Sequence, residues 1–126
     1  MTDDSPPVTI LVCDDELPLR ELVKAILGAE YRFVEAADGE SAVAVARDAR
    51  PDLLILDVML PRLTGLEVLA ELRSDPELAR TPVIVVTAWS HSERAAVEAG
   101  ASRFLEKPFD PDELRGLVEE LLGERP

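Results

Sequence analysis

Cysteine, lysine, aromatic residues and long apolar runs are all scarce in this sequence of 126 residues. The single cysteine, Cys13, excludes an internal disulfide and fits a reducing compartment. No apolar stretch approaches the ~18 residues that a membrane-spanning helix needs. The first residues are acidic and lack the basic-then-apolar order of a signal peptide. We therefore expect a cytoplasmic protein that does not cross a membrane.

Positive charge is also in short supply. Acidic residues outnumber basic ones 26 to 13, and the formal net charge is −13. A nucleic-acid backbone or an anionic membrane attracts a clustered basic surface, so this composition argues against direct binding to either. The only lysines are Lys24 and Lys107, which makes a lysine that follows an apolar run informative.

The most informative stretch is an aliphatic run, Leu53 to Leu56, that leads directly into Asp57 and is soon followed by Pro61. Such a run, bounded by polar residues and a breaker, is typical of a strand buried on both faces. Open α/β sheets keep their reactive groups at the carboxyl ends of their strands. Asp57 is therefore the first candidate for a reactive residue.

Apolar periodicity divides the chain into five strands that alternate with five helices. Strands are expected at residues 8–13, 31–35, 53–56, 82–87 and 103–106. Helices are expected at about 19–27, 42–50, 66–73, 92–99 and 111–122. This alternation predicts a single α/β domain whose parallel sheet is covered by helices on both faces. We place the domain at residues 8–122, with residues 1–7 as a loose lead-in and 123–126 as a tail.

Polar side chains follow four of the five expected strands. The residues are Asp14 and Asp15, Asp57, Thr87, and Lys107. Because the carboxyl ends of parallel strands lie at the same edge of a sheet, we expect these side chains to lie close together. The second strand ends in Glu35 and Ala36 and is expected to take no part.

The chemistry of this set points to phosphoryl transfer. Three carboxylates held close together raise one another's pKa, and a hard divalent cation such as Mg²⁺ relieves the repulsion. A carboxylate oxygen of Asp57 can attack phosphorus to form an acyl phosphate. The metal and Lys107 would neutralise the phosphoryl oxygens, and the Thr87 hydroxyl could donate a hydrogen bond to the product.

Four short motifs, in order and each at the end of an expected strand, resemble the receiver domain of two-component response regulators. They are Val12-Cys13-Asp14-Asp15-Glu16, Leu56-Asp57-Val58-Met59-Leu60-Pro61 with Gly65, Val86-Thr87-Ala88, and Phe104-Leu105-Glu106-Lys107-Pro108-Phe109. The resemblance covers nearly the whole chain. It implies a doubly wound five-stranded parallel sheet with strand order 2-1-3-4-5.

The same resemblance implies a phosphorylation site and a cofactor. Asp57 would accept a phosphoryl group from a sensor histidine kinase, a phosphotransfer protein or a small phosphodonor. Asp15, Asp57 and the backbone carbonyl of Met59 would bind Mg²⁺, and Asp14 would act through water. The protein would be a switch rather than an enzyme, with self-phosphorylation and self-dephosphorylation as its only chemistry.

The resemblance also implies how the phosphorylated state is reported. Lys107 would pair with the phosphoryl group and would precede a cis peptide bond to Pro108. Thr87 and Phe104 would form a switch pair, in which the hydroxyl moves toward the phosphate and the ring turns inward. A downstream protein or output domain would then bind the face made by the fourth helix, the fifth strand and the fifth helix.

Two further residues are predicted to flank the site. Met59 comes two residues after Asp57, and Trp89 comes two residues after Thr87. We expect Met59 and Trp89 to limit the access of water to the phosphoryl group and so to slow its hydrolysis.

Other functions on a similar scaffold fit less well. A phosphohydrolase of the haloacid-dehalogenase kind needs a second aspartate at the position of Met59. A flavin or nucleotide binder needs Gly, Ser or Thr in the turn that here runs from Asp14 to Pro18. A receiver that works without phosphorylation is disfavoured because every key position is filled.

The output remains open between a stand-alone receiver and the N-terminal half of a longer DNA-binding regulator. In the winged-helix transcription-factor subfamily, two acids commonly precede the switch aromatic and join salt bridges between subunits. Here Ser102 and Arg103 stand at those positions, and Leu117 stands where a pairing arginine is expected. These departures favour a stand-alone or differently organised regulator.

Overall fold

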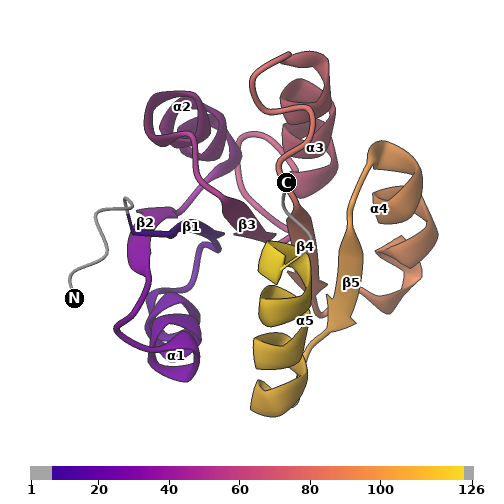
Figure 1. Cartoon of the computed structure of the whole chain (residues 1–126). Helices are drawn as coiled ribbons and strands as arrows, with labels where there is room; N and C mark the ends of the chain where they lie inside the picture. The colour runs from indigo at the N-terminus through magenta and orange to yellow at the C-terminus, as the bar shows by residue number, and fades with distance from the viewer. Residues whose placement is uncertain (1–6, 124–126) are drawn as a thin grey trace.

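Five parallel strands form one sheet in the order β2-β1-β3-β4-β5 in the computed structural model, which describes residues 7–123 (Figure 1). The strands are β1 (Thr9–Cys13), β2 (Arg32–Ala36), β3 (Leu53–Leu56), β4 (Val83–Thr87) and β5 (Arg103–Glu106). The predicted parallel sheet and its strand order are confirmed. Residues 1–6 of the predicted lead-in and 124–126 of the predicted tail lie outside the described residues.

A helix follows each strand, and the helices cover both faces of the sheet. They are α1 (Leu17–Leu27), α2 (Gly39–Ala49), α3 (Gly65–Ser74), α4 (Glu93–Ala99) and α5 (Pro111–Gly123), with a short 3-10 turn, η1 (Ser90–Ser92), before α4. Helices α1 and α5 lie on one face, and α2, α3 and α4 lie on the other, so the sheet is doubly wound (Figure 1). Within residues 7–123, no helix has both the length and the apolar character needed to cross a membrane.

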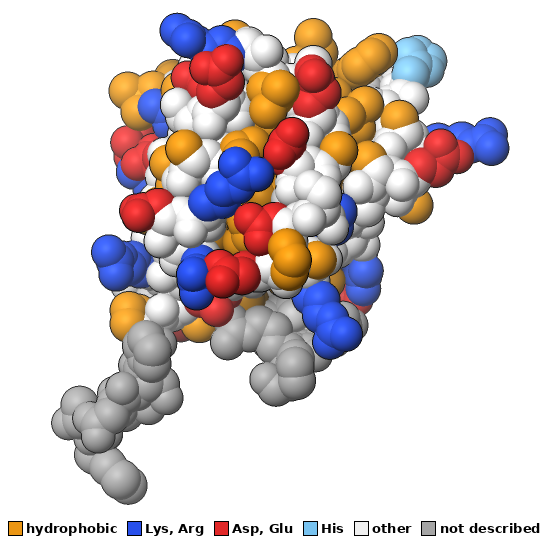
Figure 2. All heavy atoms as spheres, turned by 90° about the horizontal axis from the view of Figure 1, so that it is seen from above, with side chains coloured by type: hydrophobic (Ala, Val, Ile, Leu, Met, Phe, Trp, Pro, Cys, Tyr) orange, Lys and Arg blue, Asp and Glu red, His pale blue; other side chains and the backbone are white. Residues whose placement is uncertain are grey.

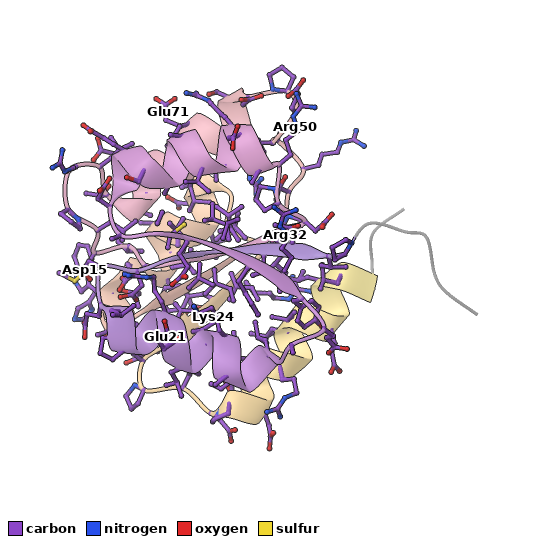
Figure 3. The ribbon with its side chains drawn as sticks, turned by 90° about the vertical axis from the view of Figure 1, so that its left-hand side faces the viewer. Asp15, Glu21, Lys24, Arg32, Arg50 and Glu71 are labelled. Carbon is purple, nitrogen blue, oxygen red and sulfur yellow. The ribbon has the colours of Figure 1, made fainter. Side chains whose placement is uncertain are left out.

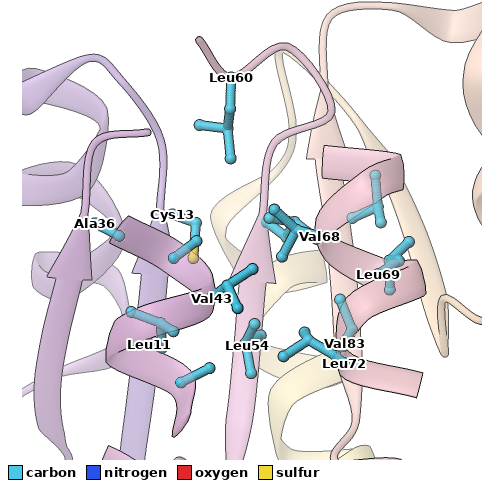
Figure 4. Packing of buried hydrophobic residues seen from close by; sticks show 14 of the residues in the cluster. Leu11, Cys13, Ala36, Val43, Leu54, Leu60, Val68, Leu69, Leu72 and Val83 are labelled. Atoms are coloured by element: carbon cyan, nitrogen blue, oxygen red, sulfur yellow. The ribbon is translucent and has the colours of Figure 1, made fainter. Parts of the chain in front are cut away.

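Side chains of the central strands point alternately into two hydrophobic cores. Leu54 and Leu56 of β3 pack toward α2 and α3, whereas Leu53 and Ile55 pack toward α1 and α5. Figure 4 shows the first core, in which Val43 of α2 and apolar side chains of α3 surround Leu54. Because both faces of β3 are buried, every position in the strand is aliphatic, which explains the uninterrupted apolar run in the sequence.

The loop after β3 is held against α3 by a close backbone approach at Gly65. A Cβ atom at this position would lie 2.3 Å from the Asp57 carbonyl oxygen and 2.6 Å from Val58 Cα. The Gly65 amide donates to the Val58 carbonyl at 2.8 Å, and a capping box between Thr64 and Glu67 begins the helix. Glycine is therefore required where α3 meets the end of the strand that carries Asp57.

Candidate functional site

Polar side chains from several strand ends meet at the carboxyl edge of the sheet. They line a hollow of about 290 Å³ whose walls are Asp15, Glu16, Asp57, Met59, Thr87, Ala88 and Lys107. Asp14 and Asp57 are buried within this edge, whereas Asp15 and Met59 are exposed at its surface. The parallel arrangement of the strands thus brings residues from distant parts of the chain into one place.

Lys107 joins the two buried carboxylates. Its Nζ donates to Asp57 Oδ2 and to Asp14 Oδ2, at 2.8 Å in each case. The second oxygen of each carboxylate accepts from the main chain, since Met59 N–H donates to Asp57 Oδ1 and Glu16 N–H donates to Asp14 Oδ1, both at 2.9 Å. All four carboxylate oxygens therefore accept a hydrogen bond, and both side chains are fixed in orientation.

These contacts set the charges of the site. Burial raises the pKa of Asp57, but the hydrogen bonds from Lys107 and the Met59 amide outweigh it, so the pKa lies below its ordinary value. Burial dominates at Asp14 and raises its pKa. Burial lowers the pKa of Lys107, but its two carboxylate partners raise it to a net value above the ordinary one. Asp57 is consequently an ionised carboxylate beside a charged ammonium group at neutral pH.

The edge also offers an oxygen-rich set of possible metal ligands. Carboxylate oxygens of Asp14, Asp15 and Glu16 lie within 4.8 Å of one another. Asp57 lies outside this group of three and is linked to Asp14 through Lys107, whose ammonium group already brings positive charge to one oxygen of Asp57 and one of Asp14. Oxygen donors of this kind are the ligands that Mg²⁺ prefers, so the residues present fit that ion. Glu16 was missed by the sequence reasoning, although it directly continues the acidic pair.

A second contact that sequence reasoning missed involves the strand expected to take no part. Arg20 of α1 donates from Nη1 to the backbone carbonyl of Asp14 at 2.7 Å and from Nε to Glu35 Oε1 at 3.0 Å. Glu35 lies near the carboxyl end of β2, directly beside Val12 of β1 in the strand register. The end of β2 therefore reaches the acidic loop through an arginine of α1.

Thr87 and Phe104, the predicted switch pair, lie on neighbouring strands. Thr87 is fully buried at the end of β4, and its Oγ1 accepts from the Trp89 amide at 3.3 Å. Phe104 is partly buried on β5, beside Val85 in the register, and packs against the core under α2, α3 and α4. The predicted cis peptide bond after Lys107 is present in the structure.

Met59 and Trp89 form an apolar rim beside the hollow. Their side chains are exposed, and together with Asp15 they line a second hollow of about 520 Å³ between the loops after β3 and β4. Met59 lines both hollows. Figure 2, seen from above, shows hydrophobic side chains near the pale blue side chain of His91, the only histidine in the sequence. The two residues predicted to flank the site therefore share the second hollow, and Met59 connects it to the hollow that holds Asp57.

Comparison with models of protein families matches residues 10–119 to the family described as response regulator receiver domain. The probable transcriptional regulatory protein TcrX of Mycobacterium tuberculosis is 45% identical over 115 residues, a match that covers 88% of this chain and 48% of TcrX. A crystal structure of a putative response regulator from Chloroflexus aurantiacus is 35% identical, with a TM-score of 0.89 over 94% of this chain and 100% of that one.

A further similar structure is the receiver domain of the sensor histidine kinase PA1611 from Pseudomonas aeruginosa, which has a magnesium ion coordinated in its active site cleft. It is 30% identical, with a TM-score of 0.86 over 94% of this chain and 100% of that one. The chain spans about half the length of the curated response regulators it matches. On the family match and these similarities, the chain belongs to the receiver domain family of two-component response regulators.

Proposed function

We propose that Asp57 is the phosphoacceptor of a signalling switch, phosphorylated by a sensor histidine kinase, a phosphotransfer protein or a small phosphodonor. The observation that carries this proposal is the bridge from Lys107 to Asp57 and Asp14 at the carboxyl edge of the sheet. A carboxylate with a lowered pKa, at the wall of an open hollow and beside a fixed ammonium group, has the form that attack on phosphorus requires.

Each group would have a separate task in the transfer. The Met59 amide holds Asp57 Oδ1, which leaves Oδ2, on the side of Lys107, to form the bond to phosphorus as the bond to the donor breaks. Lys107 would then pair with the new phosphoryl oxygens. Asp15, Asp57 and the Met59 carbonyl would hold Mg²⁺, with Asp14 acting through water, and the bound ion would supply positive charge beside the phosphoryl oxygens.

The report of phosphorylation would begin at Thr87. Its hydroxyl accepts from the Trp89 amide, so movement of the hydroxyl toward a phosphoryl group would release the loop before η1. Phe104, partly buried against the same core as α4, would then turn inward. A downstream protein or an output domain would bind the altered surface of α4, β5 and α5.

The lifetime of the phosphorylated state would depend on the apolar rim. Met59 lines the hollow that holds Asp57, and Trp89 lines the second hollow beside it, so both side chains would limit the access of an attacking water.

The output of the switch has two possible routes. TcrX is named a probable transcriptional regulatory protein and is about twice as long as the matched region, so an attached output domain is one route and a separate protein partner is the other.

The test is phosphorylation with acetyl phosphate and Mg²⁺, followed by intact-mass measurement. The unmodified chain should gain about 80 Da, the mass of one phosphoryl group. Asp57→Asn should gain nothing. Asp52→Asn is the matched control, because Asp52 lies at the opposite end of β3, where its side chain accepts from the Thr9 amide. The proposal fails if the Asp57 variant is still phosphorylated or if the unmodified chain is not.

A further inference from the structure

We propose that Arg20, held by Glu35, is a positioning residue for the acidic loop that would bind Mg²⁺. The inference rests on the proposed function of Asp57 and adds two residues of α1 and β2 to it. Arg20 would act through the main chain of Asp14. It donates to the carbonyl of that residue, and both of its side-chain contacts come from the same guanidinium group.

The main chain of Asp14 is tied to β2 in two places. Its amide donates to the Ala36 carbonyl at 3.1 Å, which extends the β1–β2 ladder by one bond. Its carbonyl accepts from Arg20, which is in turn bonded to Glu35. Both ends of the Asp14 main chain are therefore anchored to the edge strand.

Anchoring this carbonyl also orients the next residue. A peptide unit is planar, so the carbonyl of Asp14 and the amide of Asp15 rotate together. The side chain of Asp14 is held by hydrogen bonds from Lys107 and the Glu16 amide. The side chain of Asp15 is exposed, so its direction follows from the orientation of this peptide plane. Loss of the Arg20 contact would free the peptide plane between the two predicted metal-binding aspartates.

The environment makes this contact more than a surface ion pair. The Arg20 side chain is 15% exposed and that of Glu35 is 33% exposed. Partial burial raises the pKa of Glu35, but hydrogen bonds from Lys24 and Arg20 outweigh it and lower the pKa below the ordinary value. The planar guanidinium can donate in two fixed directions at once, which a lysine ammonium cannot reproduce with the same geometry.

Lys24 provides a matched control on the same helix. It bonds Glu35 Oε2 at 3.0 Å and Glu21 at 3.3 Å, one turn of α1 beyond Arg20. Figure 3 shows Lys24 and Glu21 on α1 and Asp15 at the end of the helix nearest the site. Lys24 thus has the same partner, Glu35, and the same positive charge as Arg20. Its two hydrogen bonds go to side chains, whereas Arg20 also binds the main chain of Asp14.

The experiment measures Mg²⁺ affinity from the shifts of backbone amide signals in ¹H–¹⁵N spectra during titration with MgCl₂. Arg20→Met should weaken the affinity about 10- to 100-fold, the effect typical of losing a group that orients a metal ligand. Arg20→Lys should weaken it as well, since the charge is kept and the two-directional geometry is lost. Lys24→Met should leave it unchanged. Thermal unfolding of all three variants shows how much of each change is loss of folding stability.

The outcomes separate positioning from charge. If Arg20 acted only as a nearby positive charge, Arg20→Met would tighten Mg²⁺ binding and Arg20→Lys would bind as the unmodified chain does; either result overturns the inference. Equal weakening by Arg20→Met and Lys24→Met would also overturn it, since the effect would then be general to α1. Failure of the unmodified chain to bind Mg²⁺ or to be phosphorylated refutes the proposed function itself, whereas normal behaviour of both Arg20 variants refutes only this inference.

Discussion

The ammonium group of Lys107 lies 2.8 Å from Asp57 Oδ2, although 50 residues separate the two in the sequence. The same nitrogen is 2.8 Å from Asp14 Oδ2, so one cation serves two buried carboxylates. Any divalent cation that binds these carboxylates must share them with Lys107. We therefore expect the ammonium group of Lys107 and a bound divalent cation to compete for the carboxylates of Asp14 and Asp57.

Replacing Lys107 with methionine tests this competition between the lysine and Mg²⁺. Two carboxylates would lose their shared partner, and we expect the free energy of unfolding to fall by about 1.5–3 kcal/mol without metal. Mg²⁺ should restore part of the loss, because binding to the folded state stabilises it by mass action. Chemical denaturation of both proteins, with and without MgCl₂, checks this. A loss that stays the same at all Mg²⁺ concentrations would contradict the competition.

Asp57 should also leave a signature in the pH dependence of stability. Its folded-state pKa lies below the ordinary value of 3.8, so its ionised form stabilises the fold above that pH. This contribution is lost as the pH falls through the lower folded-state pKa. Asp57→Asn should therefore lose stability less steeply below about pH 4 than the unmodified chain, as measured by urea unfolding across the acid range. Parallel curves for the two proteins would show that Asp57 has no such role.

The apolar rim gives a kinetic prediction. Trp89→Ala should shorten the lifetime of the phosphoryl group, because a large side chain that lines the hollow beside the site is removed. The loss of phosphate after donor removal measures this rate. Leu17→Ala is the control, since Leu17 is 54% exposed, close to the 48% of Trp89, and lies at the start of α1. An unchanged rate in the Trp89 variant would mean that the rim does not shield the site.

Two glycines give a matched pair of stability predictions. Gly65→Ala should destabilise the fold by about 1–3 kcal/mol, because its Cβ would lie 2.3 Å from the Asp57 carbonyl and force the backbone apart. Gly116→Ala, in the middle of α5 with nothing within 4 Å of its Cβ, should stabilise by about 0.5–1 kcal/mol. Thermal and urea unfolding compare the two. If Gly65→Ala leaves the free energy of unfolding unchanged, the close backbone approach at Gly65 is disproved.

Much of the fold follows from pattern alone. The three central strands, β1, β3 and β4, are nearly continuous aliphatic runs, because the middle of a parallel sheet is buried on both faces and leaves no polar face to interrupt them. Once the strands are parallel, the residues at their carboxyl ends must share an edge, so the neighbourhood of Asp57 could be predicted before any coordinates were known. The bridging geometry of Lys107 could not, since it depends on side-chain directions.

The contacts and burial of several side chains could not be predicted from the sequence, because they depend on strand register and on how each helix is rotated. The contact from Arg20 to Glu35 needs β1 and β2 aligned and α1 turned toward the strand ends. Leu22 has the helical spacing of a buried residue but is 49% exposed. Serine is a residue type that often caps the start of a helix, but the Ser92 side chain makes no capping bond to α4. Its hydroxyl donates to the Trp89 carbonyl instead, at 2.6 Å. Local patterns do not encode these choices, because packing between distant segments decides them.

The most direct test of the central claim locates the phosphoryl group within the chain. Borohydride reduces an aspartyl phosphate to homoserine, which peptide mass spectrometry can place at a single residue after treatment with acetyl phosphate and Mg²⁺. The account predicts homoserine at position 57, and its loss when Mg²⁺ is removed. Homoserine at position 14, 15 or 52 instead, or at none, would contradict it.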